Sequence, residues 1–207
     1  MEVETDGTPV DRTMHLAEVS RGYDVEVTGT PRTLAVDPDF RLFRRLDAVE
    51  IPPILREVAF DANAVAVVAA SDPAARTAAG ELAASFFERQ PVIIENADAA
   101  LPQHAALVVG TVKEVTALLS RAQLEAVPAD LAGEGTARAW AARRPDHTPL
   151  AIVVADDAGA LRAIVRPLPH YGGQCFVVFR GSEALAKGLW PPGPSPLWVA
   201  LPTRSPR

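Results

Sequence analysis

The residues best suited to chemistry in this sequence are Cys175, His170 and Asp156. Cys175 is the single cysteine, His170 precedes it by five residues across a Gly-Gly turn, and Asp156 ends the preceding apolar run. A thiol beside an imidazole and a carboxylate could act as a nucleophile in a small hydrolase. The alternative is structural: Cys175 opens an apolar strand, where cysteine packs as a small hydrophobe, and His170 would hold the turn.

A second group of polar residues stands where strands are expected to give way to helices. Ser71, Thr111 and Asp157 each follow an apolar run and precede a helical pattern. Free N–H groups at a helix N-terminus can bind an anion, so a nucleotide or a small ligand could bind there. The same residues are ordinary helix caps. Gly110-Thr111 lacks both the Gly-x-Gly-x-x-Gly and the Gly-Lys-Ser/Thr patterns of nucleotide loops.

No metal or cofactor site is expected in this chain. None of the four histidines lies within four residues of another, and His-Glu-x-x-His is absent. The net charge of −6 does not favour nucleic acid as a partner. No run approaches the ~20 apolar residues of a membrane span, so we expect no membrane insertion. The start lacks a signal peptide, which would place a complete chain in the cytoplasm.

The elements that must position these residues form an α/β pattern. Residues 149–180 predict a strand, a helix capped by Asp156 or Asp157, a turn at Gly172-Gly173 and a second buried strand. Strand and helix patterns also alternate from residue 60 onwards, with a short helix expected at 182–187. This order predicts a three-layer α/β sandwich with a mainly parallel sheet.

The first forty residues predict a short antiparallel β segment. Strands are expected at 2–5, 13–19, 23–27 and 33–36, separated by glycine-containing turns. Because so few large apolar side chains cannot form a core, these strands either pack on the next domain or are the margin of a truncated β-sandwich. We favour the second interpretation. The expected division is therefore a partial β segment at 1–40, a linker at 41–59, an α/β domain at 60–201 and a loose tail at 202–207.

Two stretches resemble a known family. Residues 36–46 with Glu50-Ile-Pro-Pro resemble the end of the β-domain and the linker of certain bacterial zinc aminopeptidases of the membrane alanyl aminopeptidase type. Residues 166–179, followed by Lys187-Gly-Leu-Trp-Pro, resemble an α/β module found after that β-domain in some members. In that family catalysis resides in a thermolysin-like domain with His-Glu-x-x-His and a downstream glutamate, so the resemblance implies no catalytic residue here. It implies serine at the position of Cys175.

These observations leave three functional hypotheses. The first is a non-catalytic accessory, structural or partner-binding region of a larger metallopeptidase-like protein, with zinc only in the parent catalytic domain and that domain or another protein surface as partner. The second is a module that binds a small ligand or nucleotide near Ser71, Thr111 and Asp157. The third is a small hydrolase that uses Cys175 and His170.

Overall fold

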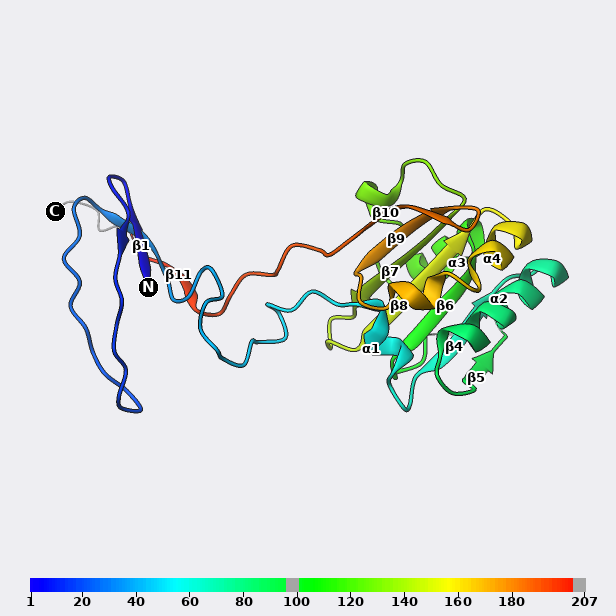
Figure 1. Ribbon diagram of the computed structural model, residues 1–207, viewed down its shortest axis with the longest axis horizontal. Coiled ribbons are helices and arrows are strands. Elements are labelled where there is room, and N and C mark those ends of the chain that lie inside the picture. The colour runs from blue at the N-terminus through cyan, green and yellow to red at the C-terminus, as the bar shows by residue number, and fades with distance from the viewer. Residues whose placement is uncertain (96–100, 203–207) are drawn as a thin grey trace. The chain divides into compact units, whose positions relative to one another are not determined.

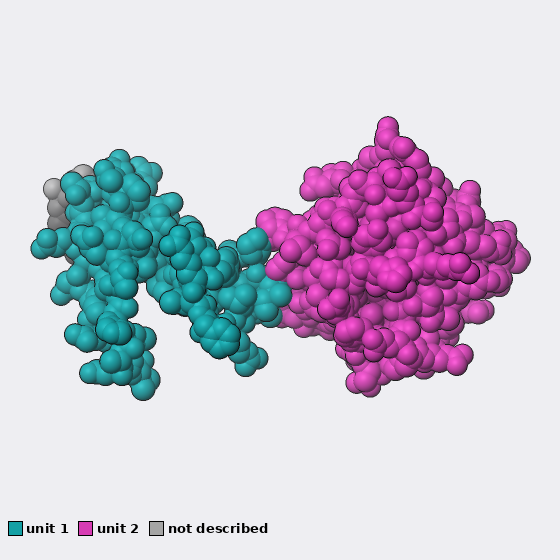
Figure 2. Space-filling model, in the orientation of Figure 1, with its two compact units in different colours: residues 1–51, 192–207 teal, residues 52–191 magenta. Residues whose placement is uncertain are grey.

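The computed structural model describes residues 1–95 and 101–202, which divide into two compact units. Unit 1 comprises residues 1–51 and 192–207, and unit 2 comprises residues 52–191; Figure 2 colours them separately. This division differs from the expected one, because the chain returns to unit 1 after residue 191. Most of the tail expected at 202–207 lies outside the described residues.

Unit 1 contains an antiparallel sheet with the strand order β11-β3-β1-β2. Its strands are β1 (Glu2–Thr5), β2 (Val10–Asp11), β3 (Pro31–Ala35) and β11 (Trp198–Ala200). The expected strands at 13–19 and 23–27 are wrong, because these segments find no strand to pair with despite their β-type alternation. Strand β11, near the C-terminal end of the chain, pairs with β3 and therefore belongs to this sheet.

Unit 2 contains a seven-stranded mixed sheet with the order β10-β9-β7-β8-β6-β4-β5, which is visible in Figure 1. The strands are β4 (Val65–Ala69), β5 (Val92–Ile94), β6 (Ala106–Thr111), β7 (Ala137–Arg143), β8 (Pro149–Ala155), β9 (Phe176–Arg180) and β10 (Glu183–Gly188). The helices are α1 (Leu55–Ala59), α2 (Pro73–Phe86), α3 (Val112–Arg121) and α4 (Ala158–Ile164), with short 3₁₀ turns at Ala129–Leu131 and Leu168–Tyr171. The α/β class is confirmed.

Strands β5, β4, β6 and β8 are parallel, as repeated strand–helix alternation requires. The β8–α4–β9 segment is a crossover, but β7 lies between its two strands and is antiparallel to both. The helix expected at 182–187 is wrong, because Gly181 takes a positive φ of 58° and turns the chain into the β9–β10 hairpin.

The buried core lies on both faces of this sheet. Alternate residues of β6 point to opposite faces, so Leu107 and Val109 join one apolar cluster while Val108 joins the other. Helices α1, α2 and α4 contribute to the first cluster and α3 to the second. This burial on two faces explains why the parallel strands are continuous apolar runs.

Candidate functional site

The ends of β4 and β6 bring together two of the residues expected at a ligand site, Ser71 and Thr111. Between them lies Glu114, from the first turn of α3. One carboxylate oxygen of Glu114 accepts hydrogen bonds from the backbone N–H of Ser71 at 2.6 Å and from the Ser71 hydroxyl. The other accepts from the Thr111 hydroxyl at 2.6 Å. The chain's own carboxylate therefore occupies both hydroxyl groups and the Ser71 N–H.

Glu114 is ionised at neutral pH. Burial alone would raise the pKa of this carboxyl group, but the hydrogen bonds from Ser71 and Thr111 outweigh it and lower the pKa below its ordinary value. A phosphate at this edge would meet a fixed negative charge. The sequence did contain a signal for this residue, because Thr-x-x-Glu is the capping-box pattern.

At the start of α4, a carboxylate of the chain itself also accepts a hydrogen bond from a backbone N–H group. Asp157 accepts a hydrogen bond from the Ala160 backbone N–H at 2.8 Å, and so acts as the helix cap. Asp156 is exposed, and its backbone N–H donates to the Thr136 carbonyl at 3.0 Å. Both aspartates lie at the same sheet edge as Thr111, because Thr111 and Ala155 are partners across β6 and β8. This edge carries several carboxylates, which disfavours an anionic ligand.

Cys175 lies at the opposite end of the sheet from Asp156. The Cys175 carbonyl accepts from the Ala141 N–H at 2.7 Å, and Ala141 pairs with Ala151 of β8. Five residues then separate this level from Asp156, or about 16 Å along a strand. A thiol–carboxylate pair therefore does not form.

The Cys175 thiol is also poorly suited to act as a nucleophile. Its side chain is fully buried, and this burial raises the pKa of the thiol above its ordinary value. His170, by contrast, is exposed in the 3₁₀ turn Leu168–Tyr171. Its backbone N–H donates to the Pro167 carbonyl at 3.1 Å, which ties it to that turn.

No protein-family model and no curated protein matches this chain. The resemblance of residues 36–46 and 166–179 to zinc aminopeptidases stays a prediction. In residues 1–95 and 101–202, no three His, Cys, Asp or Glu side chains form a group that could hold a metal ion. No helix among these residues is long and apolar enough to cross a membrane.

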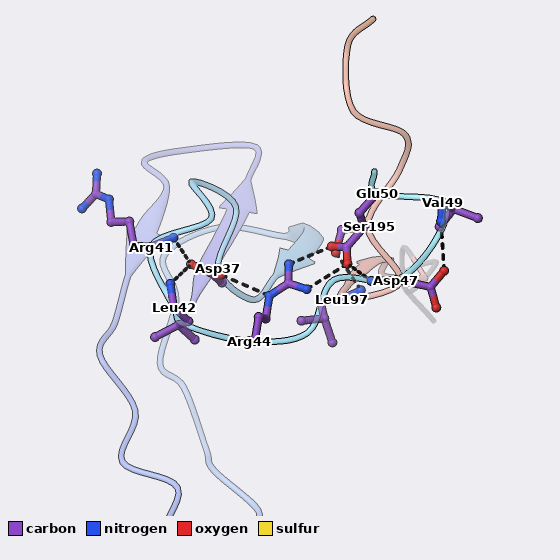
Figure 3. A network of polar contacts seen from close by, with 9 residues as sticks. All are labelled: Asp37, Arg41, Leu42, Arg44, Asp47, Val49, Glu50, Ser195 and Leu197. Atoms are coloured by element: carbon purple, nitrogen blue, oxygen red, sulfur yellow. Dashed lines mark hydrogen bonds and ion pairs between the residues drawn. The ribbon is translucent and has the colours of Figure 1, made fainter. Parts of the chain in front are cut away.

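Unit 1 contains a partly buried network of charges centred on Arg44, which Figure 3 shows. The guanidinium donates to both carboxylate oxygens of Glu50, at 2.7 and 2.8 Å, and its Nε donates to Asp37 at 3.2 Å. Glu50 also accepts from the Asp47 backbone N–H at 2.8 Å, and the Ser195 side chain adds a further hydrogen bond. The network therefore joins the 37–50 segment to the returning C-terminal segment.

Both carboxyl groups of this network stay ionised well below neutral pH. The hydrogen bond from Arg44 is the largest cause that lowers the pKa of Glu50, to about 2. For Asp37, burial acts to raise the pKa, but the N–H groups of Leu42 and Arg41 together with Arg44 outweigh it and lower the pKa. Arg41, Arg44 and Arg45 form a small basic cluster in the sequence. Of these, Arg44 forms ion pairs with Asp37 and Glu50.

Unit 1 has almost no apolar core. In the described part of this unit, the only buried apolar side chain is Val3, and the charged Asp37 and Glu50 are buried with it. Large apolar side chains are instead exposed at Leu16, Val19, Tyr23, Phe40, Leu42, Phe43, Val49, Ile51, Leu197, Trp198 and Val199. In the described part of unit 1, exposed large apolar side chains therefore outnumber the buried ones.

Proposed function

We propose that this chain is a non-catalytic, partner-binding region of a larger metallopeptidase-like protein, and that strands of its partner complete the sheet of unit 1. One observation carries the proposal: unit 1 buries a single apolar side chain while it exposes eleven large ones in its described residues. Four short strands with so little burial do not make a stable independent fold. A second β-layer supplied by the partner would cover these side chains.

The identity of the partner comes from the resemblance of residues 36–46 to the β-domain margin of bacterial zinc aminopeptidases. The partner would be the catalytic domain of such an enzyme, or the β-domain attached to it, and zinc would reside there. Unit 2 would serve as the rigid part of the region. We infer a three-layer sandwich for unit 2, supported by apolar clusters on both sheet faces.

The proposal is tested with the full chain and a matched pair of variants. The probe is the catalytic and β-domain portion of a bacterial aminopeptidase of this type, produced without its own later domains. Val199 is the central residue of β11 and is half-exposed, whereas Val92 is an exposed valine of the three-residue edge strand β5 in unit 2. We expect a complex whose Kd rises at least about tenfold for Val199→Lys, since one buried valine contributes about 1.5 kcal/mol or more. Val92→Lys should leave the Kd unchanged.

Two results would refute the proposal. The first is that titration calorimetry detects no complex, or that both lysine variants raise the Kd equally. Either outcome would mean that unit 1 is not the interface. The other is stoichiometric zinc in the purified chain, or robust aminopeptidase turnover by it alone, which would mean that the chain is itself an enzyme.

A further inference from the structure

Unit 2 contains an apolar cavity of about 330 Å³ on the face of the sheet that α3 covers. Its floor consists of two cross-strand pairs, Trp140 with Ile152 and Ala142 with Leu150. These four residues lie on one face because side chains alternate along β7 and β8. Helix α3 ends at Arg121, and the chain continues without an α-helix over the start of β8. The cavity lies where this layer lacks an α-helix.

The wall of the cavity formed by Trp190 is held in place. Trp190 forms one wall; its indole N–H donates to the Ala141 carbonyl at 3.2 Å, and its ring packs on Phe176 with the centroids 4.7 Å apart. The other wall is the 124–128 segment, which contributes Leu124 and Ala126. A wall fixed by a hydrogen bond and a ring contact leaves the space preformed, as small-molecule sites usually are.

Few charged side chains line the cavity. Its two charged lining residues in the described chain are Arg143 and Glu125. The charge of Arg143 is neutralised by Glu57, with a shortest N–O distance of 2.8 Å, while its buried Nε has no hydrogen-bond partner among the described residues. Glu125 is exposed, so water weakens its attraction for a cationic ligand. Neither a carboxylate nor an ammonium group would gain enough here to replace its lost hydration.

We propose that this cavity binds an uncharged small molecule with an aromatic or branched aliphatic ring system. Trp140 in the floor and Trp190 in the wall favour flat rings, because aromatic pairs attract each other beyond the area they bury. The volume falls at the lower end of ordinary ligand sites, which limits the occupant to a few fused or substituted rings. The inference does not depend on unit 1 or on its partner.

The test uses the full chain labelled with ¹⁵N and three related probes: indole, indole-3-acetate and tryptamine. The three tryptophans give three indole N–H signals, of which Trp140 and Trp190 line the cavity while Trp198 lies in unit 1 and serves as the internal control. We expect indole to shift the first two signals with a Kd on the order of 0.1 mM for its nine heavy atoms. The charged probes should bind at least about tenfold more weakly.

Two filling variants and one matched control complete the experiment. Ala142→Leu and Ala126→Leu should each reduce the affinity for indole at least about tenfold, because the added side chain occupies the cavity. Ala74→Leu, at an exposed position of α2, should have no effect. The inference fails if indole shifts all three signals alike, if the charged probes bind as well, or if both folded filling variants still bind indole.

Discussion

Replacing Gly110 by alanine tests whether this glycine is required for the close packing of β4 and β6. Gly110 pairs with Ala69 across the parallel strands β6 and β4. A Cβ at position 110 would lie 1.9 Å from the Ala69 carbonyl oxygen and 2.7 Å from its carbon. Both atoms belong to the backbone of a buried strand, so a side chain cannot move aside to relieve the contact. The two strands must separate locally.

The expected loss is the sum of three effects. Overpacking in a rigid interior costs about 3 kcal/mol, and a ladder hydrogen bond weakened by the separation costs about 1 kcal/mol more. Alanine recovers about 0.7 kcal/mol because it is less flexible than glycine in the unfolded chain. The net loss is about 3 kcal/mol, or about 10 °C in Tm for the roughly 140 residues of unit 2.

The assay is unfolding of the unliganded chain by urea and by heat, followed by circular dichroism at 222 nm. Every α-helix in the described residues belongs to unit 2, so this signal reports on unit 2. Gly80→Ala is the matched control: Gly80 lies inside α2 with open space around its Cβ position, so alanine should stabilise by about 0.7 kcal/mol. Wild-type stability in Gly110→Ala would refute the packing argument.

Three further predictions concern single side chains. Asp157→Ala should destabilise unit 2 by about 1 kcal/mol in urea unfolding through loss of the α4 cap, while the neighbouring Asp156→Ala should change little; equal effects would contradict the cap. The pKa of Glu50 is about 2 in the folded chain, against an ordinary value of 4.5. Its ionised carboxylate therefore contributes to the stability of unit 1 above pH 4.5, and this contribution is lost as the pH falls towards 2. Trp198 lies in β11 of unit 1, so its indole N–H signal in the NMR spectrum should shift across that pH range. The Glu50→Gln variant should show a shifted Trp198 signal at neutral pH. Cys175 should resist a thiol reagent at pH 7 until urea unfolds the chain, because burial raises its pKa; fast labelling of folded protein would contradict this.

The sequence predicted unit 2 well because its signals are local and repeated. Apolar runs such as Leu150–Ala155 and a cap such as Asp72 with Pro73 define strands and helix starts within a few residues, and tertiary packing agrees with them. Local patterns of this kind could not predict that β7 lies between β8 and β9. Strand order depends on contacts between segments far apart in the chain, which no local pattern records.

The candidate site was harder to predict. Ser71 and Thr111 were identified as helix starts, but Glu114 determines what that edge can bind, and its capping-box signal was available in the sequence. Glu50 lies six residues beyond Arg44 in an irregular segment, a spacing that corresponds to no helix or strand face. The cavity lined by Trp140 and Trp190 depends on residues fifty positions apart.

The network at Arg44 bears on the proposal that unit 1 binds a partner. Charges removed from water lose most of what their attraction supplies, so a buried ion network fixes a conformation more than it stabilises one. Unit 1 therefore has a defined arrangement of its 37–50 and 195–197 segments but little apolar burial to stabilise that arrangement. A surface that is conformationally specified and apolar, yet weakly stable by itself, is suited to be completed by a second β-layer. Under this proposal the ion network would hold the 37–50 and 195–197 segments in place, and the partner would supply the apolar burial that unit 1 lacks.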